Sequence, residues 1–253
     1  MNKLELYFSN YIKKKLSPEK VHRARSCYHR FKAFPHRKNL KVIGKIFKTD
    51  KTNSWMAQNE GHNYVSAYEE HFKSLRNKKL KILEIGIGGE DNPYIGGNSL
   101  RMWKCYFSRS LIYGVDLYDK RLMEEKRIRT FKGAQNDQVF LDDLVRQVGP
   151  FDIIIDDGSH VSSHVIETFK FLFNALNPKG FYVIEDLQTS YQDDYGGSSS
   201  DLNDPTTSMN FFKAACDSVN WKFTRNFPEE SHSLLEYINS IHFYEKICFI
   251  RKK

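Results

Sequence analysis

From Leu80 onward, short apolar runs alternate with stretches of helical periodicity. This alternation is typical of parallel βαβ units whose sheet is covered on both faces. Strands are therefore predicted at Lys81–Ile85, Leu111–Val115, Ile128–Lys132, Phe151–Ile155 and Phe181–Ile184. Helices are predicted at Ser99–Tyr106, Gln138–Gln147 and Ser162–Leu176, the last before the stop signal Asn177-Pro178-Lys179-Gly180.

Two later runs, Trp221–Thr224 and Ile241–Ile250, are predicted to form an antiparallel pair at one edge of this sheet. The expected fold is a doubly wound α/β domain with a mostly parallel, seven-stranded sheet. In such sheets, ligands bind beyond the carboxyl ends of the strands, where the strand order reverses. The residues just after each strand are therefore the candidates for chemistry.

The 253 residues, of which 40% are hydrophobic, suffice for one main domain with an appendage. Residues 1–51 carry 15 lysines and arginines against three acids, whereas the remainder carries 24 against 28. We expect residues 1–47 to be a basic helical appendage and residues 48–253 to be the main domain. A solvated appendage packed on the core or on a second subunit is favoured over a nucleic-acid or membrane-surface patch, so a homo-oligomer is possible and no nucleic acid is expected.

The sequence contains no apolar stretch of transmembrane length, and no apolar signal-peptide core follows Met1-Asn2-Lys3-Leu4-Glu5. Its four cysteines are scattered singly, without a Cys-x-x-Cys pair. These features predict a cytoplasmic protein with reduced thiols.

A glycine-containing turn follows the first predicted strand, in Glu84-Ile85-Gly86-Ile87-Gly88-Gly89. Glycines allow close approach of a ligand to the backbone, although any tight strand-to-helix turn can use them. Glu84 is the stronger signal, because a carboxylate inside an apolar strand is costly to bury without a partner. Asp116 follows the second strand, at a position where nucleotide-binding proteins place an acid for the ribose hydroxyls.

The pattern argues against a dinucleotide. The glycine spacing lacks the G-x-G-x-x-G form, and Glu90-Asp91 would repel a pyrophosphate. A cofactor without phosphates fits this turn better.

Two neighbouring strands each end in an acidic pair, Asp156-Asp157 and Glu185-Asp186. Adjacent strands lie about 4.8 Å apart, so the carboxylates at their ends can converge. Like charges at such separations repel unless a cation is present, and hard oxygen ligands suit Mg²⁺. Helix capping by the acids is the alternative. His160 follows in the same turn and is the candidate general base, with His164 as a weaker rival.

The strand ending in Glu-x-Gly-x-Gly resembles the first motif of class I S-adenosylmethionine methyltransferases. Ile154-Ile155-Asp156-Asp157-Gly158-Ser159-His160, Tyr182-Val183-Ile184-Glu185-Asp186-Leu187-Gln188-Thr189-Ser190-Tyr191 and Ser99-Leu100-Arg101-Met102-Trp103 resemble the macrolide sugar O-methyltransferases, from about Thr49-Asp50-Lys51 to the C-terminus. The resemblance implies S-adenosylmethionine and Mg²⁺ as cofactors and His160 as the catalytic base. It implies metal ligands at Asp157, Glu185 and Asp186, and cofactor contacts at Glu84, Gly86, Gly88, Asp116, Gln135 and Asp156. Asn136 and Asp137 are the substitutes for Gln135.

The implied reaction is transfer of a methyl group to a hydroxyl of a glycosylated natural product, nucleotide sugar or surface glycan. A catechol or small-phenol methyltransferase and a non-catalytic cofactor- or carbohydrate-binding protein are the alternatives. Two departures concern the acceptor: the family's large N-terminal domain is replaced by the basic segment, and Gln192-Asp193-Asp194 follows Tyr191 where the family has a Trp. Residues 193–204 could be a lid or a surface loop. Trp55, His62 and Tyr64 precede the first strand and are expected to serve in core packing.

Overall fold

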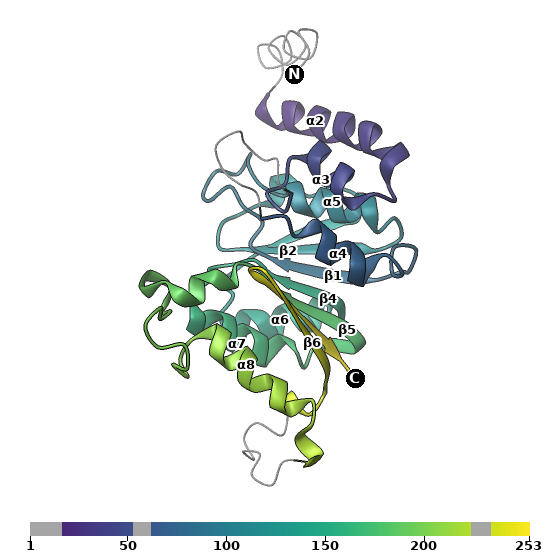
Figure 1. Cartoon of the computed structure of the whole chain (residues 1–253). Coiled ribbons are helices and arrows are strands. Elements are labelled where there is room, and N and C mark those ends of the chain that lie inside the picture. The colour runs from purple at the N-terminus through teal and green to yellow at the C-terminus, as the bar shows by residue number, and fades with distance from the viewer. Residues whose placement is uncertain (1–16, 53–61, 224–233) are drawn as a thin grey trace.

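A computed structural model of the chain describes residues 17–52, 62–223 and 234–253 (Figure 1). Its strands are β1 (Lys81–Ile85), β2 (Leu111–Asp116), β3 (Ile128–Lys132), β4 (Phe151–Asp156), β5 (Leu176–Ile184), β6 (Ile238–Tyr244) and β7 (Ile247–Lys252). Its α-helices are α2 (Pro18–Ala33), α3 (Leu40–Phe47), α4 (Val65–Phe72), α5 (Asn98–Tyr106), α6 (Gln138–Val148), α7 (Ser162–Leu172) and α8 (Ser208–Ser218). Short 3₁₀ segments occur at η1 (Phe34–His36), η2 (Arg121–Met123), η3 (Leu187–Tyr191), η4 (Asp193–Tyr195) and η5 (Trp221–Phe223).

The seven strands form one sheet in the order β3-β2-β1-β4-β5-β7-β6. The first five are parallel, and β7 runs antiparallel to both β5 and β6. The predicted doubly wound, mostly parallel α/β fold is confirmed. The strand order reverses between β1 and β4, so the ends of these two strands mark the expected ligand site.

Helices cover both faces of the sheet (Figure 1). Helices α3, α4 and α5 pack over one face, where Ile82, Ile153 and Val183 belong to their core cluster. Helices α6, α7 and α8 pack over the other, with Leu83 and Ile154 among the buried strand residues. Successive strand residues point to opposite faces, so neighbouring acids at a strand end are directed into different surroundings.

Several sequence-predicted boundaries were wrong. Residues Trp221–Phe223 form the 3₁₀ segment η5, and Thr224 lies outside the described residues. The edge pair is instead the hairpin of β6 and β7, whose turn at Glu245-Lys246 lacks the usual Gly, Asn or Pro and places Lys246 at φ 67°. Helix α7 ends at Leu172 and not at the predicted Leu176, because Leu176 already pairs with β4 as the first residue of β5. A register shift in this pairing accommodates the residues around Pro178. Helix α8 lies between the expected lid or surface loop at residues 193–204 and the run at Trp221, where no element was predicted.

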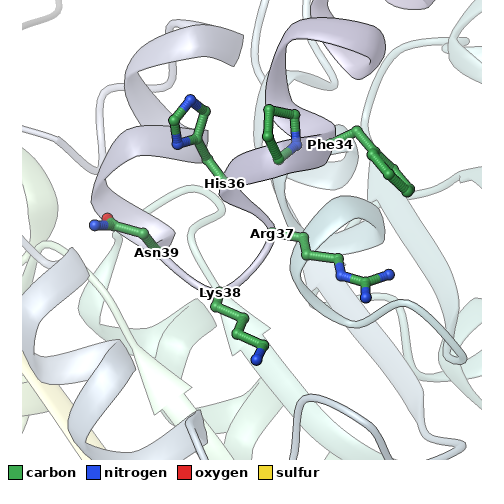
Figure 2. A pocket seen from close by; sticks show the side chains of 6 residues that line it. Phe34, His36, Arg37, Lys38 and Asn39 are labelled. Atoms are coloured by element: carbon green, nitrogen blue, oxygen red, sulfur yellow. The ribbon is translucent and has the colours of Figure 1, made fainter.

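The basic N-terminal segment is helical in its described part. Helix α2 lies at the outside of the molecule in Figure 1 and contributes Ala33 to the core cluster, whereas α3 packs within that cluster against α5. The turn between them, from Phe34 to Asn39, lines an open hollow of about 440 Å³ (Figure 2). None of the predicted site residues lies in this hollow. The division of the chain after residue 47 stays a prediction.

Within the described residues, we find no helix with the length and apolar character that a membrane crossing requires.

Candidate active site

A cavity of about 830 Å³ opens at the carboxyl ends of β1, β2 and β4. Its described lining includes the glycine turn after β1, Asp116 after β2, residues 133–136 after β3 and residues 157–160 after β4. The same lining carries five acidic residues, Asp50, Glu90, Asp116, Asp157 and Asp186, against a single lysine, Lys48. A lining of this charge favours a cationic ligand over a phosphate.

The glycine turn has the geometry that requires glycine. Gly86 has φ 78°, and a Cβ atom there would lie 1.9 Å from the carbonyl oxygen of Asp157. Gly88 has φ 72°, but a Cβ atom there would meet no heavy atom within 4 Å. Gly86 is thus needed for the contact between two loops, whereas Gly88 borders open space in the cavity. The Asp116 carboxylate accepts hydrogen bonds from the backbone amides of Ile87, at 3.1 Å, and Tyr118, at 2.9 Å, and so ties this turn to the end of β2.

Gln135 and Asp156 brace the loop after β4. The Gln135 side chain donates to the Asp156 carboxylate at 3.2 Å and accepts a hydrogen bond from the Ser159 amide at 2.5 Å. Asp156 is 2% exposed and is absent from the cavity lining, and burial raises the pKa of its carboxyl to about 7. The predicted cofactor contact of Gln135 stays a prediction, and Asp156 supports the site from beneath it.

Asp157, His160 and Asp186 come together at the edge of the cavity. Each side chain offers one ligand atom, and these atoms lie within 4.8 Å of one another. Among the described residues, these three side chains are the group that could hold a metal ion. Backbone hydrogen bonds explain the convergence: the Asp157 amide donates to Ile85 at 3.0 Å, and the Glu185 amide donates to Asp156 at 2.9 Å. The strand ends therefore bring the two acidic pairs side by side, as the sequence predicts.

His160 and Asp186 both occupy the left-handed backbone region, with φ 60° and 53°. Non-glycine residues adopt this region infrequently, and such strain concentrates at functional sites. The His160 Nε2 atom lies 3.6 Å from Asp186 Oδ2, and its ring faces the cavity that a ligand would occupy. His164, the rival base, also lines the cavity, and its Nδ1 lies 3.0 Å from Ser159 Oγ.

Glu185 and Glu84 are directed to the α4 and α5 face, where a buried lysine holds them. Lys51 Nζ lies 2.7 Å from Asp157 Oδ2, 2.7 Å from Glu185 Oε2 and 3.3 Å from Glu84 Oε1. Glu84 is fully buried, accepts a hydrogen bond from Trp103 Nε1 at 3.1 Å and lies outside the cavity lining. Glu185 also accepts a hydrogen bond from the Tyr68 hydroxyl. Its predicted role as a metal ligand stays a prediction, with both oxygens already contacted from the interior.

These contacts shape the charge of the acids. Burial raises the pKa of Glu84 to about 7, in spite of the neighbouring Lys51 ammonium. Burial also raises the pKa values of Asp157 and Glu185. The pKa of Lys51 is raised, because the nearby carboxylates outweigh the effect of its burial.

Asp186 differs from the other acids. Its burial acts to raise the pKa, but hydrogen bonds from His62 and Tyr64 outweigh this effect and hold the pKa well below its usual value. The Tyr64 hydroxyl donates to Asp186 Oδ1 at 2.5 Å, and His62 Nδ1 lies 3.0 Å from the same oxygen. Asp186 is therefore kept as a carboxylate, with Oδ2 directed toward His160.

Sequence reasoning missed four side chains that hold the acids: Lys51, His62, Tyr64 and Tyr68. Tyr64 is buried, as core packing predicts, but its hydroxyl serves the site. Trp55 lies outside the described residues. The described segment after η3 folds back, with a hydrogen bond of 2.9 Å from the Ser198 amide to Ser190, and it places the Tyr195 ring 6.5 Å from that of His160. A signal for Lys51 was present, since a buried Glu84 requires a cationic partner from elsewhere in the chain.

Comparison with known proteins gives matches to methyltransferases. No protein-family model matches the chain. An 8-demethyl-8-alpha-L-rhamnosyl tetracenomycin-C 2'-O-methyltransferase of Streptomyces olivaceus is 43% identical over 193 residues, which are 76% of this chain and 50% of that protein. Demethylmacrocin O-methyltransferase of Streptomyces fradiae is 44% identical over 195 residues, which are 76% of this chain and 49% of that protein.

A methyltransferase of the mycinamycin biosynthetic pathway, solved in complex with Mg, SAH and mycinamycin VI, has a similar structure. It superimposes with a TM-score of 0.77 at 38% identity, and the match covers 85% of this chain and 53% of that one. The strand order and the structural match show that the chain has the Rossmann-like fold of class I S-adenosylmethionine-dependent methyltransferases, with an acidic cavity where the strand order reverses. Over the matched residues, it is homologous to the sugar O-methyltransferases of glycosylated natural products. The chain spans about half the length of the curated relatives that it matches.

Proposed function

We propose that this chain binds S-adenosylmethionine in the 830 Å³ cavity and transfers its methyl group, with Mg²⁺, to a sugar hydroxyl of a glycosylated natural product. The observation that carries the proposal is the position of Asp157, His160 and Asp186 at the edge of the glycine-lined cavity. This arrangement brings cation ligands and a general base next to the space for a cofactor. The 38% identity to a methyltransferase solved with Mg, SAH and a macrolide supports both cofactors and the acceptor class.

The residues fit both groups. Carboxylate oxygens are the ligands that Mg²⁺ prefers, and the ion needs few of them because it keeps several waters. Asp157 and Asp186 would hold it, with Glu185 beside them, and it would bind two neighbouring hydroxyls and lower the pKa of the reacting one. The acidic lining suits the sulfonium charge of the methyl donor, and open space at Gly88 leaves room for the ligand.

Each residue has a distinct part in the proposed transfer. His160 accepts the proton of the acceptor hydroxyl, and Asp186 lies close enough to stabilise the imidazolium that results. Tyr64 and His62 keep Asp186 charged and oriented. The contact of Gly86 with the Asp157 backbone fixes the cofactor turn relative to the acids, so that orientation lowers the barrier.

A transfer assay tests the proposal directly. The full chain is incubated with methyl-labelled S-adenosylmethionine and a panel of glycosylated macrolides and aromatic polyketides, nucleotide sugars and catechols, with Mg²⁺ or with a chelator. We expect Mg²⁺-dependent labelling of a glycoside. Labelling of a catechol alone would overturn the acceptor class, and labelling that persists in chelator would overturn the role of the metal.

A further inference from the structure

Lys51 is a buried cation that contacts three acids, of which Glu84 and Glu185 are buried and Asp157 is partly buried. Its ammonium contacts Asp157 and Glu185, each at 2.7 Å, and Glu84 at 3.3 Å, although its side chain is only 1% exposed. These three acids belong to different strand ends: Glu84 lies in β1, Asp157 follows β4 and Glu185 follows β5. One side chain thus connects three neighbouring strands below the cavity.

We propose that Lys51 is a positioning residue, whose ammonium holds Asp157 and Glu185 in the arrangement that receives Mg²⁺ and joins them to Glu84 below the cofactor turn. This inference rests on the proposed function, since it assigns a residue to the same metal site.

Lys51 contacts one particular oxygen of each carboxylate. The ammonium holds Asp157 through Oδ2, and Asp157 also lines the cavity. Glu185 is fixed from both sides, by Lys51 at Oε2 and by the Tyr68 hydroxyl at Oε1. Each carboxylate is therefore oriented before an ion arrives. Because Mg²⁺ demands near-ideal octahedral geometry, whereas Ca²⁺ tolerates irregular sites, such orientation favours the smaller ion.

Lys51 also lies next to the cofactor side of the cavity. Its chain neighbour Asp50 lines the cavity, and Asp157 belongs to both the cavity lining and the ion group. Loss of the ammonium would leave Asp157 and Glu185 without the cation between them, and their mutual repulsion would turn them apart. We therefore expect weaker binding of both ions, with a larger loss for Mg²⁺ than for Ca²⁺.

The test is calorimetric titration of the full chain and its variants with Mg²⁺ alone and with Ca²⁺ alone. Lys51→Met removes the charge and keeps the length of the side chain, and the exposed Lys45 of α3 supplies the matched control Lys45→Met. We expect K51M to bind Mg²⁺ at least tenfold more weakly and Ca²⁺ less severely so, while K45M binds both ions as the unchanged chain does. The double variant K51M/E84Q removes the unpaired charge at Glu84 but keeps an acceptor for Trp103, so it protects the fold while Mg²⁺ binding should stay weak.

The outcomes separate the two proposals. Absence of Mg²⁺ binding by the unchanged chain would overturn the proposed function, and this inference with it. If the unchanged chain binds Mg²⁺ and the Lys51 variants bind it equally well or more tightly, the positioning role alone is overturned. Equal weakening of Mg²⁺ and Ca²⁺ would show that Lys51 only supports the fold, which also contradicts the inference.

Discussion

Gly86 and Gly88 offer a matched pair of substitutions, because both have a positive φ but only Gly86 lacks space for a side chain. Alanine in the left-handed region costs about 1–2 kcal/mol at either position. At Gly86 the added Cβ would also lie 1.9 Å from the Asp157 carbonyl oxygen and 2.9 Å from Gly158 Cα, both backbone atoms that cannot turn away. Such overpacking adds roughly 1–3 kcal/mol.

We therefore expect G88A to lower the free energy of unfolding by about 1–2 kcal/mol, and G86A to lower it by roughly 1–3 kcal/mol more. For a chain of this size, each kcal/mol shifts Tm by about 2–4 °C, so a thermal melt resolves the two variants. G88A should also weaken the binding of S-adenosylhomocysteine, because the added alanine methyl group would project into the cavity. Equal melting temperatures for G86A and G88A would refute the packing of the glycine turn against the Asp157 loop.

Three further predictions concern catalysis, metal and pH. His160→Asn, a residue that tolerates the left-handed backbone, should abolish methyl transfer while S-adenosylhomocysteine binding in calorimetry stays within a few-fold; continued turnover would contradict the assignment of the base. Mg²⁺ at 100 times its Kd should raise the free energy of unfolding by about 2.7 kcal/mol, and chelator should reverse this in a melt; no shift would argue against a folded-state ion site. Burial, with Lys48 and Arg101 nearby, lowers the pKa of His29 from 6.5 to about 4. The stability that the neutral imidazole contributes above pH 6.5 should therefore be lost as the pH falls toward 4. His29→Gln should flatten this part of the plot of Tm against pH. An unchanged profile would contradict the burial of that imidazole in the folded state.

The central strands could be predicted from the sequence because they are buried on both faces and therefore read as apolar runs. Their ends also located the acidic pairs, since adjacent parallel strands finish at the same edge of the sheet. The hairpin of β6 and β7 was harder to predict, because β6 is partly exposed and the turn at Glu245-Lys246 has no distinctive residues. Helix α8 escaped prediction because its core contribution, from Phe212 and Ala215, is short and is set between polar segments.

The acids of the site could be predicted from the sequence, but the side chains that contact these acids could not. Strand ends are local in sequence, whereas Lys51 reaches Glu185 across 134 positions and Tyr64 reaches Asp186 across 122. Alternation along β4 also separates Asp156, which contacts Gln135 on the α6 and α7 face, from Asp157, which contacts Lys51. No periodicity in the sequence specifies such long-range pairs.

The position of β7 between β5 and β6 has a consequence for how the molecule is made. Until residues 247–252 leave the ribosome, β5 has an unpaired backbone edge, although it leads directly to Glu185 and Asp186. Unpaired, apolar strand edges are templates for aggregation. Proteolytic removal of the hairpin would expose Val183 and Ile184 at that edge. The hairpin supplies none of the described cavity lining, yet it covers the edge of the strand that leads to these acids.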